Sequence, residues 1–544
     1  MRSTRSHWLD LSVAILVLGS LCPPVAIAQG LEPAEVASDL DALLATASGL
    51  PLPQQADDGV LLRRLYLDLA GRPPQVEELI EDLARDPGTR FDEVTDRLIA
   101  SQEFAANLAR YWRATILARP TEPRSAIAAN SLEFYLTEAI ENGMGWDAIA
   151  RQLITAEGSV RDDGRTALIF AQSGKPEETV AEVSRIFLGI QIQCAQCHNH
   201  PTEPWTREQF HELAAFFPRV AARPVRGDGP IDFVVSVTDQ ASPRPQRSDN
   251  RFVGTTEHYM PDLDNPDAQG TLMTPTFFVN RQSLPLGILD EVRRNALADW
   301  VTEASNPWFS RALVNRMWAE WVGVGFYQSA VDDLGPSRGV VAEEALRRLA
   351  DGFVASGHDL GWLAKTIMRT RAYRSVSQSP PASNPAHAVA RSTARRLRSD
   401  QLFDQLQQVL GTTTDSQMGA RDLGQPQRFN VNPRMQFATV FGFDPSLPVE
   451  EVNGSMTQVL MLMNGQQVQQ ALRSPQGAVA RIHAAMPDHR ALVERLYLHV
   501  LARFPTDAER ATAVRYVAGH RNRMAATEDL AWALINSAEF IQRR

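Results

Sequence analysis

Apolar residues recur at three- and four-residue intervals through most of this 544-residue chain, and this spacing most constrains its fold. In PEETVAEVSRIFLGI, residues 176–190, a proline and two glutamates precede an apolar stripe. The stripe consists of Val180, Val183, Ile186, Phe187 and Ile190. A proline and acidic residues in the first turn, followed by this period, are typical of an amphipathic α-helix. Similar patterns in 290–301, 310–322 and 343–354 predict a predominantly α-helical protein.

The first 28 residues have the pattern of a secretory signal peptide. Arg2 and Arg5 precede the uncharged run 11–21, and Ala26-Ile27-Ala28 places small residues before a cleavage site. The run is shorter than the ~20 apolar residues that cross a bilayer. We therefore expect cleavage before Gln29 and export to the periplasm or the extracellular space.

The composition argues against three features: a nucleic-acid partner, a later transmembrane helix and a lipid-modified cysteine. The net charge is −10 and the signs are mixed along the chain, so no basic face predicts a nucleic-acid partner. No later apolar run has the length of a transmembrane helix. Leu21 is bulky where a lipoprotein site has a small residue, which disfavours lipid attachment at Cys22. The mature chain then keeps Cys194 and Cys197.

Changes in composition divide the chain into segments. Residues 1–28 are the signal peptide, and residues 29–220 read as a helical domain that contains both remaining cysteines. Residues 221–285 are rich in Pro, Gly, Asp and Ser, with one strand-like piece at 231–239, and read as a loop-rich insert with slight β structure. Residues 286–544 read as a second helical domain. Within it, the Pro- and Ser-rich stretch 377–388 is expected to be an exposed connection.

The two ends of the chain resemble each other. RLYLDLAGRPP at 64–74 is similar to RLYLHVLARFP at 495–505, and LIASQEF at 98–104 is similar to LINSAEF at 534–540. Both copies predict a helix, a proline-containing turn, a second helix and a last helix that ends in Ser-x-Glu-Phe. We expect two related helical modules that superpose and that bury their apolar faces against partners.

Several motifs in order resemble a known pair of domains. RRLYLDLAGRPP, FLGIQIQCAQCHNHP and WTREQFHELAAFF are similar to DUF1549, and SRALVNRMWAEWVGVGF, VDDLG, RRLRSDQLFDQL and VLMLMNG are similar to DUF1553. These domains of unknown function occur together in large secreted bacterial proteins, notably of Planctomycetes. The resemblance implies that the C-x-x-C-H-x-H-P segment is a family feature. Many relatives also carry a cysteine shortly before the VLMLMNG motif, and residues 444–456 of this chain have none.

The segment QCAQCHNHP, residues 193–201, has the C-x-x-C-H spacing that attaches c-type haem. The thiols of Cys194 and Cys197 would add to the two vinyl groups, and the adjacent His198 would bind the iron as the proximal ligand. Export agrees with this interpretation, because c-type attachment is completed outside the bacterial cytoplasm.

Two alternatives remain open at this point. Zinc could be bound by Cys194, Cys197, His198 and His200, although these ligands are closer in sequence than is usual for zinc. Alternatively, a Cys194–Cys197 disulfide could brace the junction of two helices, with no cofactor. The preceding helix, together with a capping box of Thr206 and Gln209 that opens the next one, places the cysteines at such a junction.

If haem is present, the sixth iron ligand comes from another segment. His258, Met260 and Met273 in the loop-rich insert are the candidates, because that insert could fold over the haem. We expect His200, after the turn at Asn199, to be unable to reach the opposite face of the same ring.

Other candidate site residues are weaker. Asp332 and Asp333 could act as a carboxylate pair, although adjacent aspartates are more often a solvated turn or a helix cap. Gly323-x-Gly325 lacks the third glycine and the strand of a dinucleotide-binding loop. Four aromatic residues at helical spacing are expected in the core. These are Tyr111, Trp112, Trp318 and Trp321.

The sequence thus predicts an exported helical protein with one haem c, which serves electron transfer or redox chemistry with an unidentified partner protein. The alternatives are a non-haem scaffold that binds extracellular polymers, in which the cysteine segment is structural, and a metal-dependent hydrolase. No motif in the sequence identifies a reaction, a substrate or an oligomeric state.

Overall fold

The computed structural model describes residues 31–225, 231–239, 257–327, 330–379, 383–412, 433–448, 451–452 and 454–544. The predicted signal peptide and its cleavage site lie outside the described residues. Among the residues that are described, no helix combines the length and apolar character needed to cross a membrane.

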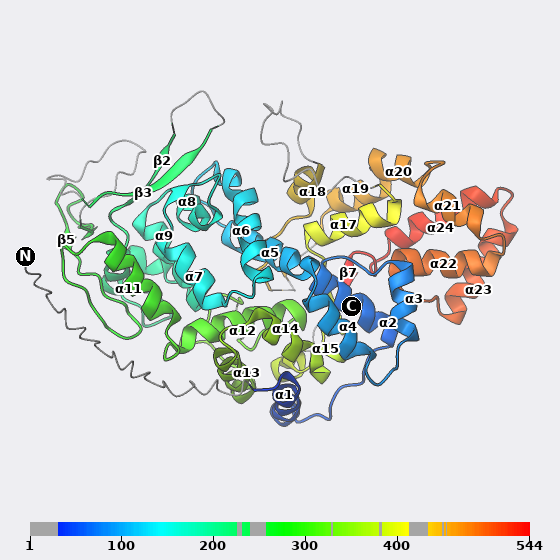
Figure 1. Ribbon diagram of the computed structural model, residues 1–544, viewed down its shortest axis with the longest axis horizontal. Helices are drawn as coiled ribbons and strands as arrows, with labels where there is room; N and C mark the ends of the chain where they lie inside the picture. Colours follow the sequence, from blue (N-terminus) through cyan, green and yellow to red (C-terminus); the bar gives the residue numbers. More distant parts are fainter. Residues whose placement is uncertain are drawn as a thin grey trace, which may run out of the picture.

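The protein is predominantly α-helical, as the apolar spacing predicts (Figure 1). The helices of the first part are α1 (Pro33–Ser48), α2 (Asp58–Leu65), α3 (Val76–Ala84), α4 (Arg90–Ile99), α5 (Gln102–Ile116), α6 (Ala129–Glu141), α7 (Trp146–Thr155), α8 (Ala167–Ala171), α9 (Pro176–Val183) and α10 (Arg207–Ala214). Those that follow are α11 (Asp290–Thr302), α12 (Pro307–Trp321), α13 (Glu343–Ala355), α14 (Leu360–Arg369), α15 (Arg371–Arg374) and α16 (Pro385–Val389). The last are α17 (Ser399–Leu410), α18 (Pro433–Phe441), α19 (Met456–Asn464), α20 (Gln466–Leu472), α21 (Ala478–Ala485), α22 (His489–Leu501), α23 (Asp507–Gly519) and α24 (Arg523–Ile535).

The strands are short and antiparallel. They are β1 (Gly158–Ser159), β2 (Val220–Pro224), β3 (Phe233–Val237), β4 (Tyr259–Met260), β5 (Thr271–Leu272), β6 (Arg395–Arg396) and β7 (Gln542–Arg543). The strand predicted at 231–239 is confirmed as β3, the central strand of the order β1-β3-β2. Val235 of β3 pairs with Gly158 on one side and Ala222 on the other. β6 pairs with β7, and Arg543 of β7 is buried.

Buried apolar side chains form two clusters. The first takes residues from helices α1 to α16 and from β2 and β3, so that the two parts of the chain before and after the short strands share one core. The second takes residues from Leu397 and helices α17 to α24. In Figure 1 these last helices, yellow to red, gather at one end of the molecule, and β2 and β3 lie at the other.

The predicted helix order of the internal repeat is confirmed. The prediction that the last helix of each copy ends in Ser-x-Glu-Phe was wrong, because residues 101–104 open α5 and residues 537–540 follow the end of α24. α2, α3 and α4 correspond to α22, α23 and α24, and α2 continues as the π-helical turn η1 (Tyr66–Ala70). Both copies also hold the same ion-pair cluster. Arg72 bonds to Glu78 and Glu103 at 2.7 Å each, and Arg503 bonds to Glu509 at 2.9 Å and to Glu539 at 2.7 Å. Each arginine lies over the tyrosine of its own motif, 5.5 Å from the ring of Tyr66 and 5.6 Å from that of Tyr497.

The two modules also contact each other. Arg63 of α2 donates to the backbone carbonyls of Gln542 and Glu539, and Arg495 of α22 forms an ion pair with Glu77 of α3. Figure 1 shows the blue helices α2 and α3 beside α22 and α23. The repeat therefore joins the start of the chain to its end.

The described residues of the Pro- and Ser-rich stretch 377–388 are mostly exposed or half-buried, as predicted for an exposed connection. The stretch runs into α16, where Ala388 is buried, and Ser377 accepts a hydrogen bond from the buried Arg64 at 2.9 Å. This contact was not predicted, because a buried cation from α2 needs acceptors that composition alone does not reveal.

Candidate functional site

Two helices bring the chain to and from the C-x-x-C-H segment. α9 begins with Pro176, continues as the π-helical turn η4 (Ser184–Leu188) and ends at Gly189, whose φ of 64° is left-handed. A Cβ on Gly189 would lie 2.8 Å from Leu334, so the turn leaves no room for a side chain. α10 begins with the predicted capping box, in which Thr206 accepts a hydrogen bond from the backbone of Gln209. The cysteines lie at the junction between these helices, as the sequence predicts.

Both cysteines face the surface. Cys194 and Cys197 lie in and just after the short 3-10 turn η5 (Gln193–Gln196); both are exposed, and both are free thiols in the structure. Ala195 between them is fully buried and anchors the turn. The carbonyl oxygen of Gln196 accepts hydrogen bonds from His211 Nε2 at 3.0 Å and from Arg207 Nε at 3.3 Å. The turn is thus held from beneath, and its thiols remain accessible.

The ring of His198 is in a tautomer that suits iron binding. Its Nδ1 lies 2.7 Å from the carbonyl oxygen of Asn199. A carbonyl only accepts, so Nδ1 donates this hydrogen bond and Nε2 is the nitrogen left for a metal. A hydrogen bond from one ring nitrogen to a carbonyl commonly fixes the tautomer and the orientation of a metal-binding histidine. His198 is exposed, so this nitrogen is available to a ligand.

The ring of His200 is in the opposite tautomer. Its Nδ1 accepts hydrogen bonds from the backbone N–H groups of Thr202 at 3.3 Å and Glu203 at 3.0 Å. The proton of the neutral ring is therefore on Nε2, and the side chain acts as a cap for the turn that follows. Among the described residues, no three His, Cys, Asp or Glu side chains are grouped as metal ligands.

A buried pair of histidines lies behind the cysteine turn. The rings of His211 and His258 are stacked 5.2 Å apart, and His211 Nδ1 is 2.9 Å from His258 Nε2. Burial lowers the pKa of His211 to about 4 and that of His258 to about 3, so both rings are neutral at pH 7. His211 donates to Gln196, so its Nδ1 must accept the proton of His258.

The three candidates for the sixth iron ligand differ in burial and in their contacts with this histidine pair. His258 is 5% exposed and its Nε2 bonds to His211, so this nitrogen is already engaged. Met273 is 4% exposed and lies beside His258 through a backbone hydrogen bond, whereas Met260 is half-buried in β4. Sequence reasoning missed His211, because nothing in a local pattern connects it with a histidine in the following insert.

Asp332 is a buried ion-pair centre. Its side chain is fully buried, with the guanidinium of Arg185 at 2.9 Å, that of Arg316 at 3.5 Å and that of Arg119 at 3.7 Å. Burial alone would raise the pKa of Asp332, but the three arginines lower it to about 2. The favoured interpretation as a solvated turn was therefore wrong for Asp332. A carboxylate held this firmly by arginines is also a poor general base.

Asp333 points to a different partner. It forms an ion pair of 2.7 Å with Arg338, which in turn lies 3.4 Å from Glu203. Glu203 is buried and accepts a hydrogen bond from the backbone of Ser337 at 3.0 Å. The loop after α12 is thereby tied to the turn after the cysteines. Asp332 and Asp333 do not act as a pair.

The other candidates are structural. The four aromatic side chains predicted for the core are each at most 1% exposed, which confirms that prediction. They are Tyr111, Trp112, Trp318 and Trp321. Gly323 has a φ of 121° and lies against Thr393, where a Cβ would be 2.7 Å away. It serves close packing after α12.

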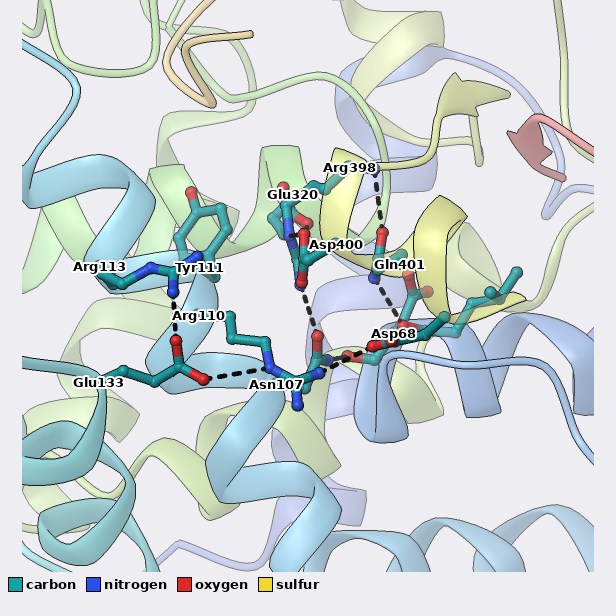
Figure 2. A network of polar contacts seen from close by, with 12 residues as sticks. Asp68, Asn107, Arg110, Tyr111, Arg113, Glu133, Glu320, Arg398, Asp400 and Gln401 are labelled. Carbon is teal, nitrogen blue, oxygen red and sulfur yellow. Dashed lines mark hydrogen bonds and ion pairs between the residues drawn. The ribbon is translucent and has the colours of Figure 1, made fainter. Parts of the chain in front are cut away.

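A polar network joins α5 and α6 to α17 (Figure 2). Arg398 bonds to Glu320 at 3.0 Å, to Asp400 at 3.1 Å and to the side-chain oxygen of Asn107 at 2.5 Å. Asn107 in turn donates to the carbonyl of Asp68 at 2.8 Å. The charged side chains of this network form ion pairs with each other. We infer that the network stabilises the contact between segments that are distant in sequence.

Two family models match the chain. One, described as a protein of unknown function (DUF1549), matches residues 41–222, and the other, described as a protein of unknown function (DUF1553), matches residues 293–445. The chain contains a DUF1549 region followed by a DUF1553 region. The cysteine segment lies in the DUF1549 region, and Asp332 and Arg398 lie in the DUF1553 region. The ion pair of Asp332 with Arg185 and the hydrogen bond from Arg398 to Asn107 therefore join the two regions. No curated protein and no solved structure matches the chain.

Proposed function

We propose that this DUF1549/DUF1553 protein is exported and carries one c-type haem on Cys194, Cys197 and His198, for electron transfer or redox chemistry. The observation that carries the proposal is the contact of His198 Nδ1 with the carbonyl oxygen of Asn199 at 2.7 Å, which leaves Nε2 of this exposed residue as the nitrogen for iron. Two exposed thiols precede it at the spacing that haem attachment needs. When bound, the haem would supply one-electron chemistry.

The chain's own residues would hold and orient this group. His211 and Arg207 fix the Gln196 carbonyl between the two cysteines, so the turn does not depend on a cofactor for its shape. His200 caps the following turn and leads the chain away from His198. Because Cys194 and Cys197 are exposed, the haem would lie at the surface, where a redox partner protein could approach its edge.

The alternatives have less support. A zinc site that includes His200 would require its ring to lose the two hydrogen bonds that it accepts from backbone N–H groups. A hydrolase that uses Asp332 would need a carboxylate freed from its three arginines. A scaffold with a Cys194–Cys197 disulfide remains the principal alternative, and it predicts a colourless protein.

Visible spectra of three proteins test the proposal. The wild type, His198→Ala and His200→Ala would each be produced with a c-type maturation system. We expect haem absorbance in the wild type, a changed ligand-field spectrum in His198→Ala, and a nearly unchanged spectrum in His200→Ala. A colourless wild type, or equal spectral changes in both variants, would refute the assignment of His198.

A further inference from the structure

One cleft is lined by no residue of the cysteine segment and has no role in the proposed function. Its volume is about 580 Å³, within the range of small-molecule sites. It lies where α4 ends and α5 begins, beside the end of α6 and the start of α14, and α4 packs against α14 (Figure 1). Residues of both the DUF1549 and the DUF1553 regions line the cleft. The lining of the cleft includes Asp96, Glu141, Asp359, Trp362 and Lys365.

Trp362 provides a fixed aromatic wall. Its indole N–H donates to the carbonyl of Leu31 at 2.8 Å, which holds one edge of the ring. A Cβ on Gly352 of α13 would lie 2.5 Å from Cη2 of the indole, so the glycine allows the ring to seat against that helix. The side chain is only half-buried. The ring is therefore held in place before any ligand arrives, which reduces the entropic cost of binding.

The charges that line the cleft are mostly negative. Lys365 is its single basic lining residue, and its ammonium lies 2.8 Å from the carboxylate of Asp96. The carboxylates of Glu141 and Asp359 have no such basic partner among the residues that line the cleft. An anionic ligand would be repelled here, whereas a cation would be attracted by both carboxylates.

We propose that this cleft binds a small organic cation, with a quaternary ammonium group against the indole of Trp362 and near Glu141 and Asp359. Tryptophan is the aromatic side chain that attracts a cation most strongly through its ring face, and the carboxylates add to that attraction. The cleft is lined by both apolar and carboxylate side chains. A quaternary ammonium group needs both, because its methyl groups pack against apolar side chains and its charge is attracted by carboxylates.

Calorimetric titration with choline tests the proposal on the full mature chain. The neutral isostere 3,3-dimethyl-1-butanol has the same shape without the charge, and we expect it to bind at least about tenfold more weakly. Trp362→Leu should weaken choline binding about tenfold, and Trp362→Phe should restore part of it. Glu141→Gln should weaken binding about threefold, whereas the matched control Glu138→Gln, an exposed residue on the same helix that does not line the cleft, should leave it unchanged.

Absence of choline binding at millimolar concentration would overturn the proposal. Equal binding of the neutral isostere would also overturn it, because the charge would then play no part. If Trp362→Leu does not fold, the Trp362→Phe and Glu141→Gln variants still decide the outcome, since affinity equal to the wild type in both would contradict the assigned site.

Discussion

Leu67 and Leu498 occupy equivalent positions in the two repeated motifs, and each is buried in the hydrophobic core of the opposite end of the chain. Leu67 of the N-terminal module belongs to the cluster formed by α17 to α24. Leu498 of α22 belongs to the cluster formed by α1 to α16. The two modules therefore exchange one leucine each, and the two cores are coupled across the whole length of the sequence.

This exchange predicts a long-range effect on stability. Leu67→Ala should lower the free energy of unfolding by about 2–5 kcal/mol, because the side chain is fully buried. The loss should increase proteolytic cleavage within 397–540, far from the substituted residue. Ile80→Ala, at an exposed position in α3, is the matched control and should have little effect. Increased cleavage confined to the first 120 residues would contradict the exchange.

A second prediction concerns the link between the DUF1549 and DUF1553 regions. Asp332→Asn keeps the shape of the side chain and removes the charge that lies between Arg185 and Arg316. We expect a loss of about 3 kcal/mol in the free energy of unfolding, because the buried Arg316 loses its ion pair and Arg185 keeps only its ion pair with Glu182. Asp333→Asn, whose partly exposed carboxylate pairs with Arg338, should cost about 1 kcal/mol or less. Denaturant titration of both variants measures the two losses in the free energy of unfolding. Equal losses would show that the buried ion pairs of Asp332 stabilise the fold no more than the partly exposed pair of Asp333.

The histidine pair predicts a loss of stability in acid. Burial lowers the pKa of His258 to about 3 in the folded protein, below its ordinary value of 6.5. As the pH falls below about 6.5, the unfolded chain takes up a proton that the folded chain refuses, so the free energy of unfolding decreases down to about pH 3.

His258→Gln isolates this contribution, because the amide can still donate to His211. Between pH 6 and 4, the stability of the wild type should fall more steeply than that of the variant, by at most about 1.4 kcal/mol per pH unit. His520→Gln, at an exposed position, should keep the wild-type slope. Identical slopes in the wild type and His258→Gln would mean that His258 is not held neutral by its surroundings.

Local patterns predicted the elements around the candidate site. The stripe in 176–190 is a helix whose apolar residues are buried, and the Thr206–Gln209 capping box starts α10. These features depend on neighbours within a few residues, which the sequence contains explicitly. The helix order of the repeat could be predicted for the same reason.

Long-range pairing of polar groups could not be predicted. The contacts of His211 with His258, of Asp332 with Arg185, and of Arg64 with Ser377 join residues that no periodicity relates. A buried charge depends on which partner the fold brings within about 3–4 Å, and an isolated Asp-Asp pair carries no sign of that partner. The tautomers of His198 and His200 likewise follow from backbone geometry after the fold has formed.

Measurement of the mass of the denatured protein tests the central claim most directly. The protein would be produced with a c-type maturation system, denatured and analysed by mass spectrometry, with a pyridine haemochrome spectrum of the same sample. We predict a haem-sized mass increment that survives denaturation and disappears in the Cys194→Ala/Cys197→Ala double variant. A folded, colourless protein without the increment, and with an intact Cys194–Cys197 disulfide, would contradict the haem assignment.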